Sequence, residues 1–294
     1  MSAPSSVAAV VVSHNTRDLL RACVESLVRA REAGEVAEIV VVDSGSGDGS
    51  VEIARELLGD AAVIAVPNRG YGSAANVGMD ATSASYALVL NADTLVPAGA
   101  VRTLARFLDV HPWTALAGPR LRRPDGSTQL SRRRFPTRLT PLFESTIVEE
   151  WWPSNRWARH YRMEDAPDAG AQEVDWLVGA ALLARRAAFE QAGGFDPAFR
   201  MYSEEVEWCW RFRLRGWQVA WVPDAEITHY EGASTRQDVP TRQLDFDLSR
   251  VQLMQRLYGR RHAAFVRVAL LAGYLIHIVR EALKWVVGHR RELR

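Results

Sequence analysis

The stretch Tyr86-Ala-Leu-Val-Leu-Asn-Ala-Asp-Thr-Leu-Val96 says most about the fold of this chain. Residues 87–90 are apolar, which is typical of a strand buried on both faces of a parallel sheet. A carboxylate cannot follow such a strand unless it is solvated, paired or bound to a cation. Ligands of open α/β sheets bind beyond the carboxyl ends of the strands, and carboxylate oxygen is a ligand for Mg²⁺ or Mn²⁺. We therefore expect a binding site at Asn91 and Asp93, although an Asx turn in which Asp93 caps a helix fits the same pattern.

The residues before this stretch alternate between strand and helix patterns. Strands are predicted at 7–12, 38–42 and 62–66, and helices at 51–58 and 73–82. This alternation predicts an α/β fold with a doubly wound, mostly parallel sheet flanked by helices.

Asp43 ends the second predicted strand and is followed by a glycine-rich turn. Such a turn also occurs in dinucleotide-binding folds, where the glycines follow the first strand. Here the first strand ends in Ser13-His-Asn15 without glycine, which excludes that motif. A carboxylate at 43 is suited to accept the imide N–H of uracil or thymine, or a ribose hydroxyl. A turn-forming aspartate is the alternative.

Composition narrows the class of protein. The chain has 294 residues, 48% of them hydrophobic, and a formal net charge of +1, which excludes disorder and argues against nucleic-acid binding. Cys23 and Cys209 are far apart in helix-like segments and indicate buried thiols in a reducing compartment. Because residues 1–12 lack the features of a signal peptide, we expect a cytoplasmic protein.

The second half of the chain contains a pair of acids at the start of a helix. A strand is predicted at 174–177, and Ser203 is predicted to cap a helix from Glu204 to about 215. The helix dipole would stabilise Glu204 and Glu205 even if they had no other role. Alternatively, one of them is a general base that deprotonates an attacking hydroxyl.

The C-terminal segment is basic and helical in pattern. Residues 256–294 contain nine Arg or Lys against two Glu, a local charge of +7. The apolar run at 268–276 is about half the length needed to cross a bilayer, so we expect that it does not span one. It is predicted to lie on an anionic membrane surface, or else to pack on the rest of the protein.

Taken together in this order, several segments resemble those of inverting family 2 glycosyltransferases of the GT-A fold. The likeness is closest to the bacterial rhamnosyltransferase-like branch and covers about residues 7–235. The segments are 10–15, 41–50, 68–78, 91–93, 193–196, 202–205 and 210–211.

The resemblance implies roles for residues at the strand ends. Asp43 would recognise the nucleobase, with Ser13 and Asn15 nearby, and Asn68 and Asn76 would bind the nucleotide or order its loop. The segment Asn91-Ala92-Asp93 stands where the family has Asp-X-Asp. Asp93 would therefore hold a divalent cation on the donor diphosphate, and Asn91 would contact ribose or metal-bound water. His229 would be a further metal ligand.

The resemblance also places the catalytic base. Glu205 matches the aspartate of a Glu-Asp pair, with a side chain longer by one methylene, and Glu204 is the fallback base. On the same helix, Arg211 is a candidate for neutralising the diphosphate, or a solvated arginine.

An acceptor region is predicted between the metal strand and the acidic helix. Arg132, Arg133 and Arg134 are candidates for binding a lipid diphosphate, and Trp176 and Gly179 for the approach of a sugar. A solvated basic loop is the alternative.

The predicted organisation is a glycosyltransferase domain over 1–235, with a nucleotide-sugar half to about 118, and a helical basic extension over 236–294. We expect a metal-dependent enzyme that transfers L-rhamnose from dTDP-rhamnose to a bacterial envelope glycan or lipid-linked saccharide on the inner face of the cytoplasmic membrane. The alternatives are a UDP-hexose-dependent hexosyltransferase and a non-catalytic nucleotide-sugar-binding or scaffold protein.

Overall fold

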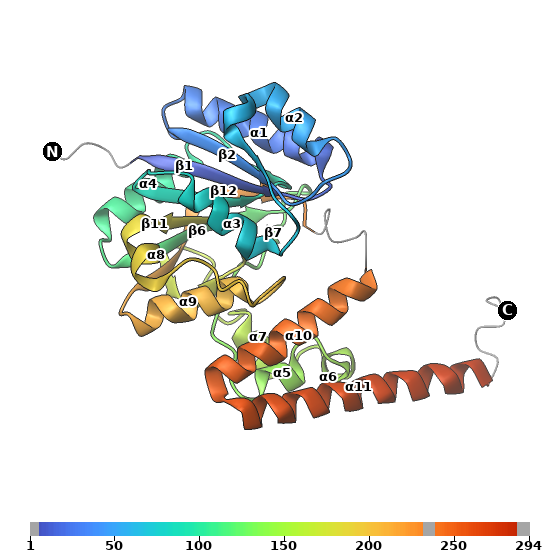
Figure 1. The fold of residues 1–294 in the computed structure, drawn as a ribbon. Coiled ribbons are helices and arrows are strands. Elements are labelled where there is room, and N and C mark those ends of the chain that lie inside the picture. The colour runs from blue at the N-terminus through green and yellow to red at the C-terminus, as the bar shows by residue number, and fades with distance from the viewer. Residues whose placement is uncertain (1–5, 232–238, 287–294) are drawn as a thin grey trace.

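The computed structural model describes residues 6–231 and 239–286, and its centre is one large sheet between layers of helices (Figure 1). The first half of the sheet is parallel. Its strands are β1 (Val7–Ser13), β2 (Glu38–Asp43), β3 (Val63–Ala65) and β4 (Tyr86–Asn91). The registers place Ser13 beside Asp43 and Val12 beside Asn91, so the predicted donor residues share one edge.

The second half of the sheet is mixed. Its strands are β5 (Thr94–Leu95), β6 (Thr114–Arg122), β7 (Thr128–Gln129), β9 (Gln172–Val174), β11 (Ala181–Arg185) and β12 (Gln218–His229). The strand order is β3-β2-β1-β4-β11-β6-β12-β5, with β7 on β6 and β9 on β12. The antiparallel β11, between β4 and β6, interrupts the predicted parallel arrangement, which resumes where β6 and β12 pair in parallel.

The predicted strand at 174–177 is divided between two sheets. Val174 ends β9, whereas β10 (Trp176–Leu177) pairs with β8 (Arg132–Arg133) in a separate two-stranded ribbon. The ribbon brings the arginine segment towards the acidic helix. The boundary expected near 118 falls inside β6, so the two predicted halves share one continuous sheet.

Helices cover both faces, as expected for an α/β protein. One face carries α1 (Arg17–Glu32), α2 (Ser50–Leu58) and α4 (Ala100–Val110), and the other α3 (Tyr71–Asp80), α8 (Arg186–Ala192) and α9 (Glu204–Leu214). A 3₁₀ turn, η1 (Asp60–Ala62), precedes β3. Close packing of α3 requires glycine, since a Cβ on Gly78 would lie 2.2 Å from the Val10 side chain.

A helical layer lies below α9 (Figure 1). It contains α5 (Thr140–Phe143), α6 (Ile147–Trp151), α7 (Arg156–Tyr161), α10 (Val239–Tyr258) and α11 (Arg260–Val286). Val251 and Met254 of α10 join the same core as α9, so the predicted extension packs on the catalytic domain. The boundary predicted at 235 lies outside the described residues.

The last helix differs from the sequence prediction. Residues 260–285 form one helix that is long and apolar enough, by length and composition, to cross a membrane. The prediction of a segment too short to span counted only 268–276, but the helix continues through the charged residues on both sides. Only 11% of its apolar window is buried, so it is not a core helix.

Candidate active site

The loops after β1 and β2 are joined into one wall at the donor edge. Asp43 is 1% exposed, and its carboxylate accepts hydrogen bonds from the Ser46 amide (2.9 Å) and hydroxyl (2.6 Å). Asn15, with φ of 50°, donates its amide to Ser46 Oγ (2.8 Å) and accepts from the Gly47 amide (2.9 Å). The buried Ser13 hydroxyl bonds to Thr16 (3.2 Å). Ser13, Asn15 and Asp43 thus fix the loop geometry that a nucleobase would meet.

Asn68 and Asn76, both in the segment 68–78, order loops. Asn68 accepts from the Gly70 amide (3.2 Å). Asn76 brackets the backbone of Phe195, accepting from its amide and donating to its carbonyl, both at 2.8 Å. Of the two roles expected for Asn76, the structure shows loop ordering.

Asp93 and His229 face each other at the end of β12. The β5–β12 pairing places His229 opposite Thr94, and Asp93 Oδ1 lies 3.3 Å from His229 Nε2. His229 Nδ1 donates to Gln129 Oε1 (2.8 Å), so a neutral imidazole turns its Nε2 lone pair towards the carboxylate. Such a pair needs a proton or a cation between the two atoms.

The residues of this pair fit a divalent cation. Asp93 is 3% exposed, and its Oδ1 has no hydrogen-bond partner in the part of the chain that the structure describes. Carboxylate oxygen and imidazole nitrogen are both ligands for Mn²⁺. Within residues 6–231 and 239–286, no group of three or more His, Cys, Asp or Glu is placed to hold a metal, so the protein would supply two ligands. Asn91 and Ala92 precede Asp93 at the strand end; Asn91 is partly exposed and Ala92 is buried.

The acidic pair begins α9. Burial raises the pKa of Glu204 well above its usual value, and the neighbouring Glu205 charge raises it further. Burial raises the pKa of Glu205 to about 7, against the opposing effect of backbone hydrogen bonds at Gly179 and Val206. One oxygen of each carboxylate is buried without a hydrogen-bond partner among the described residues. A carboxylate that titrates near neutral pH is suited to general-base catalysis.

Tyr71 supports the acidic pair through Gly179, a role that the sequence did not indicate. Its buried hydroxyl donates to the Gly179 carbonyl (3.1 Å), and the Gly179 amide supports the Glu205 carboxylate. Burial raises the pKa of Tyr71 well above its usual value, and the charges of Glu204, Glu205 and Asp93 add to this effect. The glycines on either side of Tyr71 were the available sequence signal, since Gly70 approaches the Arg200 carbonyl and Gly72 the Phe195 side chain too closely for a Cβ.

The turn into α9 is strained. Tyr202 (φ 67°) and Ser203 (φ 66°) are consecutive residues in the left-handed region, where side chains other than glycine are rare. The prediction that Ser203 is the N-cap of a helix beginning at Glu204 is confirmed in position, but the Ser203 side chain makes no capping hydrogen bond. Strain of this kind persists where the surrounding structure holds it, and it clusters at functional sites.

Arg211 points away from the donor edge. Its guanidinium pairs with Glu207 (2.9 Å) and donates to the carbonyls of Ala192 (2.5 Å), Gly193 (3.2 Å) and Gly194 (2.6 Å). The side chain therefore clamps the glycine turn, and we no longer assign it to the diphosphate.

The three acceptor arginines have different environments. Arg132 is buried on the Trp221 ring and donates hydrogen bonds to the carbonyls of Ala166 and Pro167. Arg134 pairs with Asp165 (2.8 Å). These two stabilise the loop.

Among the arginines at 132–134, Arg133 is the one that is available to bind a ligand. Its guanidinium donates to backbone carbonyls and lies 5.9 Å from the Trp176 ring centre, with no carboxylate within ion-pair distance in the described residues. Arg133 stands opposite Trp176, three residues before Gly179, which lies next to the Glu205 side chain, and its charge lowers the pKa of Glu205. Trp176 itself is held by a hydrogen bond from its indole to the Arg134 carbonyl (2.9 Å).

Comparisons with known proteins show the family of the chain. Residues 8–210 match the model of glycosyl transferase family 2. The chain is 31% identical over 241 residues to N-acetylglucosaminyl-diphospho-decaprenol L-rhamnosyltransferase of Mycobacterium tuberculosis, covering 78% of this chain and 77% of that one. It is 28% identical over 188 residues to the low-salt glycan biosynthesis hexosyltransferase Agl10 of Haloferax volcanii, covering 60% and 54% of the two chains.

Solved structures show the same fold. Mannosyltransferase PcManGT from Pyrobaculum calidifontis, in complex with GDP-Man and Mn²⁺, matches with a TM-score of 0.53 and 17% identity over 97% of this chain and 81% of that one. GalNAc-T7 with UDP, GalNAc and Mn²⁺ matches with a TM-score of 0.56 and 17% identity, over 76% of this chain and 43% of that one. Because the family model spans more than half of the sequence, the chain belongs to glycosyl transferase family 2.

Proposed function

We propose that this glycosyltransferase transfers L-rhamnose from a dTDP-linked donor to the saccharide of a polyprenyl-diphosphate acceptor, with inversion at the anomeric carbon. The similarity to the mycobacterial decaprenol-linked rhamnosyltransferase over 78% of the chain supports this donor and acceptor. The catalytic part rests above all on Glu205, a buried carboxylate at the start of α9 that lies next to Gly179 and has a pKa of about 7.

Glu205 would act as the general base in a single displacement. Its carboxylate takes the proton of the acceptor hydroxyl while that oxygen forms a bond to the anomeric carbon, and the bond from this carbon to the donor diphosphate breaks. Gly179 and Tyr71 hold the carboxylate in place. Because burial and the neighbouring Glu205 charge raise the pKa of Glu204, a second negative charge on the pair is disfavoured.

Asp93 and His229 would hold a divalent cation. Bound there, Mg²⁺ or Mn²⁺ would neutralise the departing nucleoside diphosphate. The lone pair of His229 Nε2 opposite the unpartnered Asp93 oxygen supports this assignment. The wall formed by Ser13, Asn15, Asp43 and Asn68, with Asn91 at the next strand end, would receive the nucleoside.

Arg133 would bind the acceptor diphosphate. A half-buried guanidinium without a carboxylate partner is costly unless an anion joins it, and a diphosphate supplies that charge. Arg133 stands on the ribbon beside Trp176, close enough to Glu205 to lower its pKa. The acceptor saccharide would then extend past Gly179 towards the base.

Helix α11 would place the enzyme on the inner face of the cytoplasmic membrane. Its outward side carries exposed apolar residues, among them Leu271 (61% exposed), Leu275 (62%) and Ile278 (65%). Its inward side carries His277 and Arg280, both paired with Glu150. A helix with its polar side on the protein and its apolar side outward is arranged to lie in a membrane interface.

Calorimetric titration of donors tests this proposal. We expect dTDP-rhamnose to bind in the presence of Mn²⁺ and at least tenfold more weakly without it, and UDP-glucose, UDP-galactose and UDP-N-acetylglucosamine to bind more weakly. Preference for a UDP-hexose would overturn the rhamnosyl assignment and favour the hexosyltransferase alternative, to which the archaeal relative belongs.

A further inference from the structure

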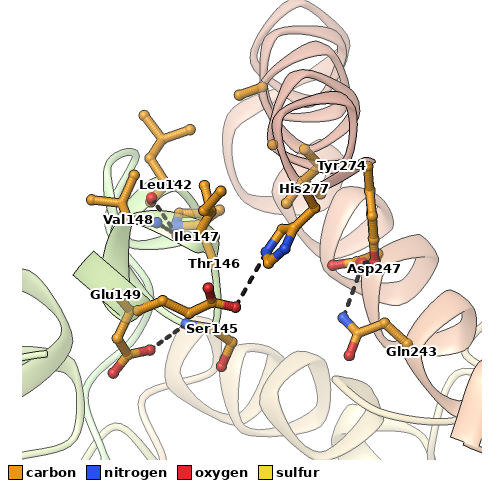
Figure 2. A pocket seen from close by; sticks show the side chains of 15 residues that line it. Leu142, Ser145, Thr146, Ile147, Val148, Glu149, Gln243, Asp247, Tyr274 and His277 are labelled. Carbon is orange, nitrogen blue, oxygen red and sulfur yellow. Dashed lines mark hydrogen bonds and ion pairs between the residues drawn. The ribbon is translucent and has the colours of Figure 1, made fainter. Parts of the chain in front are cut away.

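A large cavity lies between the short helices α5 and α6 and the paired helices α10 and α11. Its volume is about 770 Å³, within the range of small-molecule sites. Figure 2 shows Tyr274 and His277 of α11 facing the segment from Leu142 to Glu149 across this space. The apolar part of the lining consists of Pro141, Leu142, Ile147, Val148, Ala269 and Leu270.

Most polar groups of the lining already have partners. One oxygen of Asp247, Oδ2, accepts from the Tyr274 hydroxyl and from the Gln243 amide (3.1 Å), whereas Oδ1 has no hydrogen-bond partner among the described residues and lies 3.8 Å from Arg250 Nη1. Glu149 accepts from the Ser145 amide (2.6 Å) and pairs with Arg162 (2.5 Å). Because these carboxylates already face donors or cations, they offer little to a polar ligand, and the apolar part of the lining suits an uncharged, apolar group.

Helix α10 separates this cavity from the acidic pair. Gln243 and Asp247 of α10 line the cavity. From the same helix, Ser249 donates to the Met201 carbonyl (2.7 Å) and Phe246 packs edge-on against Tyr202, with ring centres 5.5 Å apart. These contacts hold the strained turn that leads into Glu204 and Glu205. The cavity therefore lies about one helix diameter, roughly 10 Å, from the strained turn at Tyr202 and Ser203.

The helix that lines the cavity on one side, α11, exposes apolar residues on its other side. Gly273 and His277 line the cavity, and Leu271 and Leu275 lie outward on the same turns. A ligand leaving the cavity past this helix would meet an apolar surface. A long hydrocarbon chain could thus be buried at one end and continue along the helix at the other.

We propose that this cavity binds the isoprene units nearest the diphosphate of a polyprenyl-linked acceptor. The inference rests on the lipid-linked acceptor of the proposed function and adds a site for its hydrocarbon chain. The charges set the direction: Arg133, which stands opposite Trp176 and has no carboxylate partner among the described residues, would attract the diphosphate, and the apolar part of the cavity lining would receive the chain. Binding would then come from burial of apolar surface.

Filling the cavity tests the proposal. A Cβ at Gly273 would lie 3.7 Å from the Ile147 side chain, an ordinary contact, so the rest of a leucine would occupy the cavity. Ala269→Phe fills it from the same wall of α11. Ala272→Leu is the matched control, because Ala272 is an exposed neighbour on α11 outside the lining.

The first readout is binding of geranylgeranyl diphosphate alone, measured by calorimetry below its micelle concentration. We expect binding by the wild type and by Ala272→Leu, and at least tenfold weaker binding by Gly273→Leu and Ala269→Phe. Isopentenyl diphosphate, which keeps the diphosphate but has a single isoprene unit, should bind at least tenfold more weakly than the longer chain to the wild type. Equal affinity for the two diphosphates, or no effect of either filling variant, would overturn the proposal.

This readout needs no transfer activity, so it separates the two proposals. Failure of dTDP-rhamnose to bind would reject the rhamnosyl donor and leave the lipid result standing. Binding of dTDP with Mn²⁺ by Gly273→Leu shows that the variant is folded. Flotation of the filling variants with vesicles of equal parts phosphatidylglycerol and phosphatidylcholine distinguishes binding in the cavity from binding to the bilayer. If vesicle binding falls together with binding of geranylgeranyl diphosphate, the lipid binds on the outer side of α11 and the cavity site is overturned.

Discussion

The ionisation of Glu205 should control the rate of transfer. A general base works only when ionised, and burial raises the pKa of this carboxyl to about 7. We therefore expect kcat/KM to fall about tenfold per pH unit below pH 7 and to level off above it. A pH–rate profile measured with saturating Mn²⁺ checks this. A rate that stays flat down to pH 5 would show that Glu205 is not the base.

The ionised carboxylate of Glu205 should lower the free energy of unfolding at high pH. Its pKa in the folded protein, about 7, lies above the ordinary value of 4.5, so its contribution to folding is fully present below pH 4.5 and is lost as the pH rises through 7. Glu205→Gln should therefore raise the free energy of unfolding by about 3 kcal/mol at pH 8 and by less at pH 5.5. Urea unfolding at the two pH values checks this. An equal effect at both would contradict a raised pKa.

Removing either member of the Asp93–His229 pair should abolish the effect of Mn²⁺ on donor binding. Asp93→Asn keeps the shape of the side chain and removes its charge, and His229→Gln removes the imidazole. We expect donor affinity with Mn²⁺ to fall at least tenfold, to the value measured without metal. The calorimetric control is Asp109→Asn, an aspartate on α4 outside the site. Metal-stimulated binding that survives both changes would exclude this pair as the ligands.

At the scale of elements, the glycine turn before the catalytic helix is held from two sides. Asn76 of α3 brackets the Phe195 backbone, and Arg211 of α9 binds the carbonyls of residues 192–194. A Cβ on Gly194 would lie 2.4 Å from the Asn76 side chain, so the turn and the asparagine fit closely. This turn joins α8 to the segment that leads into the acidic pair. The position of Glu205 therefore depends on the position of the turn.

Arg211→Lys should therefore destabilise the fold without weakening donor binding. Lysine cannot reproduce the planar contacts with Glu207 and three carbonyls, and loss of a largely buried pair costs about 3 kcal/mol. Urea unfolding and dTDP titration below the unfolding transition measure the two effects separately. Unchanged stability together with tenfold weaker dTDP binding would restore the diphosphate role that the sequence predicted.

The sequence predicted which strands end in functional side chains, but not every partner of those side chains. Asp43 and Asp93 follow apolar runs, and that pattern is visible without a structure. The clamp made by Arg211 depends on carbonyl groups from a turn 17 to 19 residues away, and backbone carbonyls carry no sequence signal. The division of residues 174–177 between two sheets likewise depends on strands distant in the chain.

At the scale of the whole molecule, the alternation of strands and helices was sufficient to predict the α/β class. The antiparallel β11 was not predicted, because its apolar pattern is the same as that of a parallel strand. The length of α11 was underestimated because charged residues interrupt its apolar run, and the structure turns His277 and Arg280 inward onto Glu150. Only the packing of α10 and α11 shows which side of the helix faces out.

The outward side of α11 should bind anionic membranes. We expect Leu271→Asp combined with Ile278→Asp to reduce flotation with phosphatidylglycerol vesicles at least tenfold, because both apolar side chains are exposed on this helix. Val110→Asp, an equally exposed apolar position on α4, is the matched control and should have no effect. Raising the salt to about 1 M should weaken binding through screening of the basic residues. Undiminished flotation of the double variant would exclude this face.

The central claim is a single displacement with Glu205 as the base. Its most direct test is NMR of the product formed from dTDP-rhamnose and a polyprenyl-diphosphate N-acetylglucosamine acceptor, with the wild type and with Glu205→Gln under single-turnover conditions. We predict a product of inverted anomeric configuration, formed about 10² to 10⁴ times more slowly by the variant while the donor binds equally well. A product of retained configuration, or an undiminished rate in Glu205→Gln, would contradict the mechanism.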